Sequence, residues 1–406
     1  MIYLDYQATT PLAPEALQAM LPWLQSQHAN PHSAHAPGRA ARAAVAVARD
    51  QVAALLPDDG DVSFTSGATE ALNWALKGVG PGRIVTQATE HAAVLDTVAA
   101  LRERGREVVV LPVDADGVVD YDAAAEAIIP GTALVACMLV NNEIGTIQPV
   151  SELAELAHGA GALMLCDAVQ GYGRIAIPEG PDLIAISAHK IHGPKGIGAL
   201  WIRDGVTLAP LLHGGGQEVA GRSGTLSPAL CAGFGAAAKL MAEQGDADWE
   251  HVSALRNAAL ERLNIPPLPA REGSGVGAEP QGSASTPAEE RVPTGREPTP
   301  SPSLEGRGGW QLNGSPDHRY PGNLNIRRDG LDVARLMSEL RDIAFSAGSA
   351  CASGSGRASH VLRAIGLTEA QARSSIRLGF GRYTTQEELM TALDRIDATA
   401  RAQFPS

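Results

Sequence analysis

The residue with the clearest potential for chemistry is Lys190, which follows an apolar run from Leu183 to Ile186 that we interpret as a buried strand. The lysine lies in a turn rich in glycine and proline, Ser187-Ala188-His189-Lys190-Ile191-His192-Gly193-Pro194. A lysine at the end of a core strand is costly if it stays charged and unpaired. Its amine could instead form a Schiff base, for example with pyridoxal phosphate. A solvated loop lysine is the alternative that this segment alone leaves open.

A second reactive group is Cys351, which lies in the small-residue stretch from Gly348 to Gly356. A cysteine in such a loop can be exposed and can move. The thiolate is the nucleophilic form, so a lowered pKa or a nearby base is required. The alternative is a small apolar side chain packed at the base of a loop, because free cysteines are usually buried.

The other three cysteines show no pattern of a reactive or metal-binding group. Cys137 and Cys166 lie inside apolar strands and are expected in the core, and Cys231 begins a helix without a functional signal. No pair has C-x-x-C spacing, so we expect neither a zinc site nor a redox dithiol, and no metal is predicted.

Strands and helices alternate along most of the chain, which predicts a mostly parallel sheet with helices on both faces. The expected strands are 62–65, 83–86, 108–112, 132–140, 162–166, 183–186 and 198–203. The expected helices are 14–23, 38–56, 71–77, 92–104, 122–129, 151–159, 230–244 and about 248–263. Ser151 and Glu152 are expected to cap the sixth of these helices.

Polar side chains fall repeatedly where the expected strands end. In open α/β sheets, ligands bind beyond the carboxyl ends of the strands, so these residues predict a single site. They are Thr69, His91, Asn142, Asp167, Gln170, His189 and Lys190. The turn from Ser66 to Glu70 opens a helix directly after a strand, which suits a phosphate group. An ordinary Ser/Thr helix cap explains that turn equally well.

Length and charge limit the class of protein. A chain of 406 residues exceeds one typical core, so two domains are expected. A net charge of -13 argues against nucleic acid or an anionic membrane surface as the main partner. No apolar run approaches the ~20 residues of a membrane span. The N-terminus lacks the basic and apolar regions of a signal peptide, and we expect a cytoplasmic protein with reduced thiols.

One segment differs in composition from the rest. Residues 266–309 are rich in proline, glycine, serine, glutamate and arginine, and no aromatic residue occurs between Trp249 and Trp310. Such a sequence cannot bury enough apolar surface to order itself, which predicts a disordered insertion.

Nine short motifs, in order along nearly the whole chain outside 266–309, resemble those of cysteine desulfurases of the NifS/IscS type, within the class-V aminotransferases. They are Tyr3 to Pro11, Ser66 to Glu70, Thr89-Glu90-His91, Val140 to Gly145, Asp167 to Gln170, the lysine segment, Arg222 to Thr225, Gly348 to Cys351, and Ser375-Ile376-Arg377. The resemblance implies an α/β fold of fold-type I pyridoxal-phosphate transferases. The large domain, residues 13–249, would carry a mixed, mostly parallel seven-stranded sheet. Residues 1–12 and 250–406 would form a small α+β domain.

The resemblance also implies a role for each site residue. Lys190 would form the Schiff base with pyridoxal 5'-phosphate and move the Cα proton. Asp167 would pair with the pyridinium nitrogen, and His91 would stack on the ring and shuttle a proton. Arg377 would hold the substrate carboxylate, to which Asn30 would contribute. The ring oxygen O3′ would be held by Asn142 and Gln170, and the phosphate by Ala68, Thr69, Ser187, His189 and, from the partner subunit of a homodimer, Thr225.

The implied reaction is desulfuration of L-cysteine to L-alanine, with a persulfide formed on Cys351. The sulfur acceptor would be a protein of iron–sulfur cluster assembly or of tRNA thiolation, and neither nucleic acid nor a membrane would be bound directly. Because the chain ends soon after its last expected helix, we expect it to lack the longer tail that some relatives use for a scaffold protein.

Two other classes of function stay open at this level. Fold does not fix the reaction, so aminotransfer or selenocysteine lysis on the same fold is a competitor, against which Cys351 argues. A partner protein that has kept the fold without activity is the other. Retention of the lysine, aspartate, histidine, cysteine and arginine together argues against that reading.

Overall fold

The computed structural model describes residues 1–218, 221–266, 309–348 and 358–404. Almost all of the predicted insertion 266–309, and Cys351 itself, lie outside the described residues.

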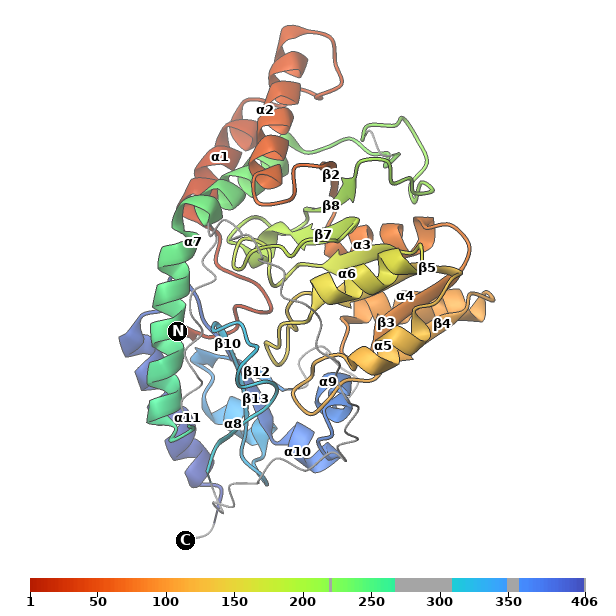
Figure 1. The fold of residues 1–406 in the computed structure, drawn as a ribbon. Helices are drawn as coiled ribbons and strands as arrows, with labels where there is room; N and C mark the ends of the chain where they lie inside the picture. Colours follow the sequence, from red (N-terminus) through yellow and green to blue (C-terminus); the bar gives the residue numbers. More distant parts are fainter. Residues whose placement is uncertain (219–220, 267–308, 349–357, 405–406) are drawn as a thin grey trace, which may run out of the picture.

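A seven-stranded sheet forms the centre of the larger part of the molecule (Figure 1). Its strand order is β2-β8-β7-β6-β5-β3-β4. Strands β3 to β7 run parallel to one another, whereas β8 is antiparallel to both β2 and β7. The mixed, mostly parallel sheet expected from the sequence is therefore confirmed. The strands are β2 (Gly60–Thr65), β3 (Arg83–Gln87), β4 (Val108–Leu111), β5 (Thr132–Met138), β6 (Leu163–Asp167), β7 (Leu183–Ser187) and β8 (Gly198–Arg203).

Both faces of this sheet are covered because successive side chains of a strand point to opposite faces. Leu134 of β5 packs in a cluster with residues of α3 and α4, whereas its neighbour Val135 packs in a cluster with residues of α1, α2, α5 and α6. The helices are α1 (Pro14–Gln25), α2 (Ala36–Ala53), α3 (Ala68–Gly78), α4 (Ala92–Glu103), α5 (Tyr121–Ala127) and α6 (Val150–Gly159).

Helix α7 (Pro228–Arg262) is a single helix of 35 residues, where the sequence predicted two. It runs along one side of the molecule from α1 and α2 to α11 (Figure 1). Its first half contributes Cys231, Phe234 and Met241 to the core beneath the large sheet, and its second half contributes Val252 and Leu260 to a separate core. An interior glycine such as Gly245 costs only about 1 kcal/mol. Burial of the helix in two cores outweighs that cost, so the helix does not break there. The predicted domain boundary at residue 249 falls inside this helix and stays a prediction.

A second correction concerns α6. Its N-cap residue is Pro149, and Ser151 lies inside the first turn, where its hydroxyl donates to the carbonyl of Glu179 at 3.1 Å. The sequence pattern placed the cap two residues too late.

The second core belongs to smaller sheets built from both ends of the chain. Strands β9 (Gln311–Leu312), β10 (Asn323–Arg327), β12 (Ser346–Ala347) and β13 (Ser375–Gly379) form an antiparallel sheet in the order β12-β13-β10-β9. Strand β1 (Ile2–Tyr3) pairs in parallel with β11 (Ile343–Ala344). The N-terminal segment is thereby fixed beside the C-terminal part. The helices here are α8 (Val333–Glu339), α9 (His360–Ala364), α10 (Glu369–Arg373) and α11 (Gln386–Arg401).

Within the described ranges, no helix combines the length and apolar character needed to cross a bilayer. Nor do those ranges contain a group of three or more His, Cys, Asp or Glu side chains arranged to hold a metal ion.

Strand β8 approaches the turn before α3 so closely that only glycine fits at position 198. A Cβ atom on Gly198 would lie 2.6 Å from the carbonyl oxygen of Ile186 and 2.7 Å from the carbonyl carbon of Gly67. We predict that Gly198→Ala destabilises the protein by about 1–3 kcal/mol, as overpacking does. Denaturant unfolding measures this. Gly80→Ala is the control, because no atom lies within 4 Å of its added Cβ. Equal stability of the two variants would contradict the packing described.

Candidate active site

A cavity of about 380 Å³ lies beyond the carboxyl ends of β5, β6 and β7. Its volume is within the range of small-molecule sites. The structure brings together there the predicted residues Ala68, Thr69, His91, Asn142, Asp167, Gln170, Ser187, His189, Lys190 and Arg377. The expectation that polar residues at the strand ends share one site is confirmed.

Three predicted residues are not part of this cavity as described. Asn30 is exposed, and its side-chain oxygen accepts a hydrogen bond from the backbone N–H of His32 at 2.9 Å. Thr225 is also exposed, in a loop that the Arg222–Glu70 ion pair (2.8 Å) holds against the first turn of α3. Cys351 lies outside the described residues. The roles of these three residues stay predictions.

Lys190 ends a short 3₁₀ turn, Ala188–Lys190, directly after β7. Its ammonium group donates to the backbone carbonyls of Gln7 (2.5 Å) and Ala8 (2.8 Å). Its own carbonyl accepts from the guanidinium of Arg174. The N-terminal segment therefore covers the lysine and fixes where its amine lies, which the sequence did not reveal.

Asp167 and His91 both line the cavity, and burial shifts the pKa of each toward its neutral form. Burial raises the pKa of Asp167, although the neighbouring His91 and Lys190 act in the opposite direction. Burial also lowers the pKa of His91. His91 is the N-cap of α4, where its Nδ1 accepts from the backbone N–H of Ala93 at 3.1 Å. In neutral His91 the ring proton is therefore on Nε2.

The residues predicted to hold a phosphate lie around the start of α3. Ala68 and Thr69 are in its first turn, whose backbone N–H groups have no partner within the helix. Ser187 ends the neighbouring strand β7. Burial and the nearby charge of Lys190 lower the pKa of His189 to about 4, so its ring is neutral at pH 7. Its Nδ1 lies 3.2 Å from the hydroxyl of Thr9.

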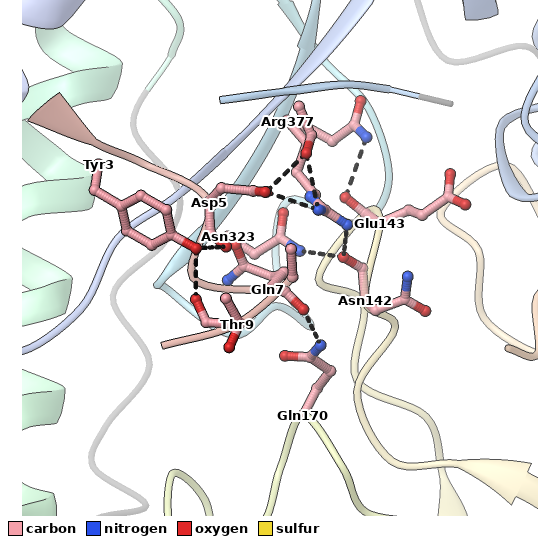
Figure 2. Close-up of polar contacts among 12 residues, drawn as sticks. Tyr3, Asp5, Gln7, Thr9, Asn142, Glu143, Gln170, Asn323 and Arg377 are labelled. Carbon is pink, nitrogen blue, oxygen red and sulfur yellow. Dashed lines mark hydrogen bonds and ion pairs between the residues drawn. The ribbon is translucent and has the colours of Figure 1, made fainter. Parts of the chain in front are cut away.

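Arg377 lies on β13, across the cavity from the large sheet. Figure 2 shows its guanidinium between Asp5 and the loop of Asn142. Its Nη2 donates to Asp5 Oδ1 at 2.9 Å and to the hydroxyl of Ser346 at 3.2 Å, and its Nη1 donates to the carbonyl of Asn142 at 3.0 Å. Asp5 and Ser346 also line the cavity, and neither had been assigned a role. The signal for Asp5 was its place in the motif Tyr3 to Pro11.

Two buried carboxyl groups lie behind the cavity and were also missed. Glu90 precedes His91, and its Oε1 accepts from the backbone N–H of Met138 (2.6 Å) and from Gln87 (2.9 Å). Burial, with a contribution from Asp167, raises the pKa of Glu90 to about 8. Glu143 follows Asn142 and accepts a hydrogen bond from Ser359, the N-cap of α9. Burial raises the pKa of Glu143 as well.

Residues 2–275 match the family Aminotransferase class-V. The cysteine desulfurase of Saccharomyces cerevisiae mitochondria is 42% identical over 96% of this chain and 72% of its own length. The chain belongs to the cysteine desulfurase family. The cysteine desulfurase IscS of Rickettsia bellii is 38% identical over 97% of this chain and 90% of its own length. A solved NifS-like protein superimposes with a TM-score of 0.81 at 30% identity, covering 98% of both chains.

Enzymes of this family use pyridoxal phosphate, and the residues that line the cavity of this protein fit that group. A buried carboxylate, Asp167, is available to a protonated ring nitrogen, and the first turn of α3 with neutral His189 suits a phosphate. The absence of a side chain at Gly198 permits the close turn that begins that helix. Lys190 lines the same cavity.

The carboxyl group of Glu90, buried behind the cavity, allows its burial to be tested through the pH dependence of stability. The carboxyl pKa rises from its ordinary value of 4.5 to about 8 in the fold. A raised acid pKa contributes stability that is full below pH 4.5 and is lost as the pH rises through about 8. We predict that Glu90→Gln becomes more stable relative to the unsubstituted protein as the pH rises from 4.5 to about 8. The difference in their free energies of unfolding should change by at most ~1.4 kcal/mol per pH unit.

Melting temperatures at pH 5, 6.5 and 8 measure this trend. Glu155→Gln is the matched control, since Glu155 is exposed on α6. A difference between Glu90→Gln and the unsubstituted protein that does not change with pH would show that Glu90 is not held neutral.

Proposed function

We propose that this protein is a cysteine desulfurase, which converts L-cysteine to L-alanine and carries the sulfur as a persulfide on Cys351. The observation that carries the proposal is the meeting of Lys190, Asp167, His91 and Arg377 in one cavity. Similarity over 96–97% of this chain to proteins named cysteine desulfurases supports the reaction class.

The proposed cofactor is pyridoxal 5'-phosphate. Lys190 would hold it covalently, Asp167 would face its ring nitrogen, and His91 would lie against its ring. Asn142 and Gln170 would hold O3′, while Ala68, Thr69, Ser187 and His189 would surround its phosphate. When bound, the cofactor supplies an electron sink that makes the Cα–H bond of an amino acid acidic.

The residues of the chain divide the remaining work. The planar guanidinium of Arg377 suits an α-carboxylate, because a fork of N–H groups matches two carboxylate oxygens. Lys190, which lines the cavity, would take the Cα proton at Nζ. Neutral His91 can hold or move a proton at Nε2, since its Nδ1 is used by the backbone of α4.

The sulfur step belongs to Cys351. Its thiolate attacks the sulfur atom of the substrate, and a sulfur–sulfur bond forms as the Cβ–S bond breaks. The electron pair of the broken bond stays on Cβ, which takes a proton and becomes the methyl group of L-alanine. An acceptor protein then removes the terminal sulfur, for iron–sulfur cluster assembly or tRNA thiolation.

We also propose that two copies of the chain form a homodimer with shared sites, to which Thr225 of one copy contributes. The exposure of Thr69 and Thr225 in the single chain supports this, because surface remains at the phosphate end of the cavity for a second subunit to cover. A reducing, cytoplasmic location is supported by the free thiols of Cys137, Cys166 and Cys231.

Incubation with L-cysteine and a thiol reductant tests the proposal. We predict equal release of L-alanine and sulfide by the unsubstituted protein. Cys351→Ser should lose at least 99% of both while keeping the yellow colour of the cofactor. Cys231→Ser is the control, because Cys231 is buried away from the cavity and should leave the rate unchanged.

Bound cofactor without alanine release would contradict the proposal. Selenocysteine and pairs of amino and keto acids would then be tested as substrates. Loss of colour in Cys351→Ser would instead assign Cys351 a structural role.

A further inference from the structure

Asp5 forms a direct ion pair with the arginine that faces the substrate. Its Oδ1 lies 2.9 Å from Nη2 of Arg377 (Figure 2). Among the described residues, Asp5 is the acidic side chain that forms a salt bridge with Arg377. Only 3% of Arg377 is exposed, so the pair is poorly screened by water. The side chain of Asp5 is 21% exposed and lines the cavity. A carboxylate is therefore already present beside the guanidinium.

The position of Asp5 is fixed by contacts other than the ion pair. Asp5 follows β1 and forms a parallel bridge with Gly379 at the end of β13, the strand that carries Arg377. The hydroxyl of Ser346 donates to the same Oδ1 at 2.7 Å. Asp5 therefore cannot move away readily when another carboxylate enters the cavity.

A second carboxylate that binds to Arg377 gains attraction to the guanidinium but meets repulsion from Asp5. Among the described residues that line the cavity, the acidic side chains are Asp5 and Asp167, and the lysine and arginine side chains are Lys190 and Arg377. The two acids lie in different parts of the cavity. Asp167 is at the end of β6 in the large sheet, whereas Asp5 pairs with Arg377. Asp5 thus offsets the charge that a ligand carboxylate would otherwise meet in full.

We propose that Asp5 weakens the binding of the α-carboxylate of substrate and product at Arg377, and so sets their affinity and speeds release of the amino-acid product. This inference rests on the proposed function only in that Arg377 receives the α-carboxylate. Asp5 acts through Arg377 and need not touch the reacting atoms.

The test uses Asp5→Asn in the protein loaded with its cofactor. The amide oxygen of asparagine can still accept from Arg377 and Ser346, so the substitution removes charge and keeps the geometry. L-alanine and ethylamine are titrated against the cofactor absorbance. Both have the same amine and methyl group, and only alanine carries a carboxylate. We expect the Kd for L-alanine to fall at least fivefold and the Kd for ethylamine to stay within twofold.

Asp248→Asn is the matched control. Asp248 on α7 pairs with Arg382 at comparable burial, outside the cavity. This variant should leave both dissociation constants unchanged. If Asp5→Asn does not fold, Asp5→Ser removes the same charge with a smaller side chain.

Tighter binding of alanine alone supports the proposal, and structural damage cannot produce it. Unchanged or weaker alanine binding, or an equal change for ethylamine, overturns it. The titration needs no sulfur release, so absence of desulfuration in a protein that binds alanine would refute the proposed function and leave this inference testable.

Discussion

The buried guanidinium of Arg377 connects three parts of the chain that are far apart in sequence. It donates to Asp5 in the N-terminal segment, to the carbonyl of Asn142 after β5, and to Ser346 on β12. A buried charge is tolerated only when it is paired and hydrogen-bonded, so these three segments must lie together for the arginine to be stable. The cavity exists at the place where they meet. Arg377, which would bind the substrate, therefore also holds together the segments that form the cavity.

The loop of Asn142 is the large-sheet side of this junction. The carbonyl of Asn142 also accepts from the side chain of Asn323 at 3.3 Å, and the carbonyl of Glu143 accepts from the side chain of Asn325 at 3.1 Å. Both asparagines lie on β10, beside β13. The proposed cofactor side of the cavity comes from the large sheet and the proposed substrate side from the smaller one. Side-chain amides join the two sides through backbone carbonyls. A shift of either sheet would move Arg377 relative to Lys190, which makes their spacing a property of both cores.

Features that depend on local periodicity could be predicted from the sequence. The alternation of strands and helices predicted the mostly parallel sheet, and the polar residues after its strands predicted the shared position of His91, Asp167 and Lys190. Features that depend on contacts across the fold could not. The sequence around Gly245 predicts a break in α7, and only burial in two cores keeps that helix continuous. Asp5 lies in the motif Tyr3 to Pro11, but its ion pair could not be predicted, because its partner Arg377 lies 372 residues away. The roles implied for Asn30 and Thr225 stay predictions, because both residues are exposed in the single chain and lie outside the cavity as described.

We propose that the planar guanidinium at position 377, held by three segments, determines substrate binding. Arg377→Lys keeps the positive charge but cannot donate to Asp5, Ser346 and Asn142 with the same geometry. The most direct measurement is kcat/KM for L-cysteine in this variant, with cofactor content measured in parallel. We predict a loss of at least 100-fold in kcat/KM with the cofactor still bound. A kcat/KM within threefold of that of the unsubstituted enzyme would contradict it, because charge alone would then suffice.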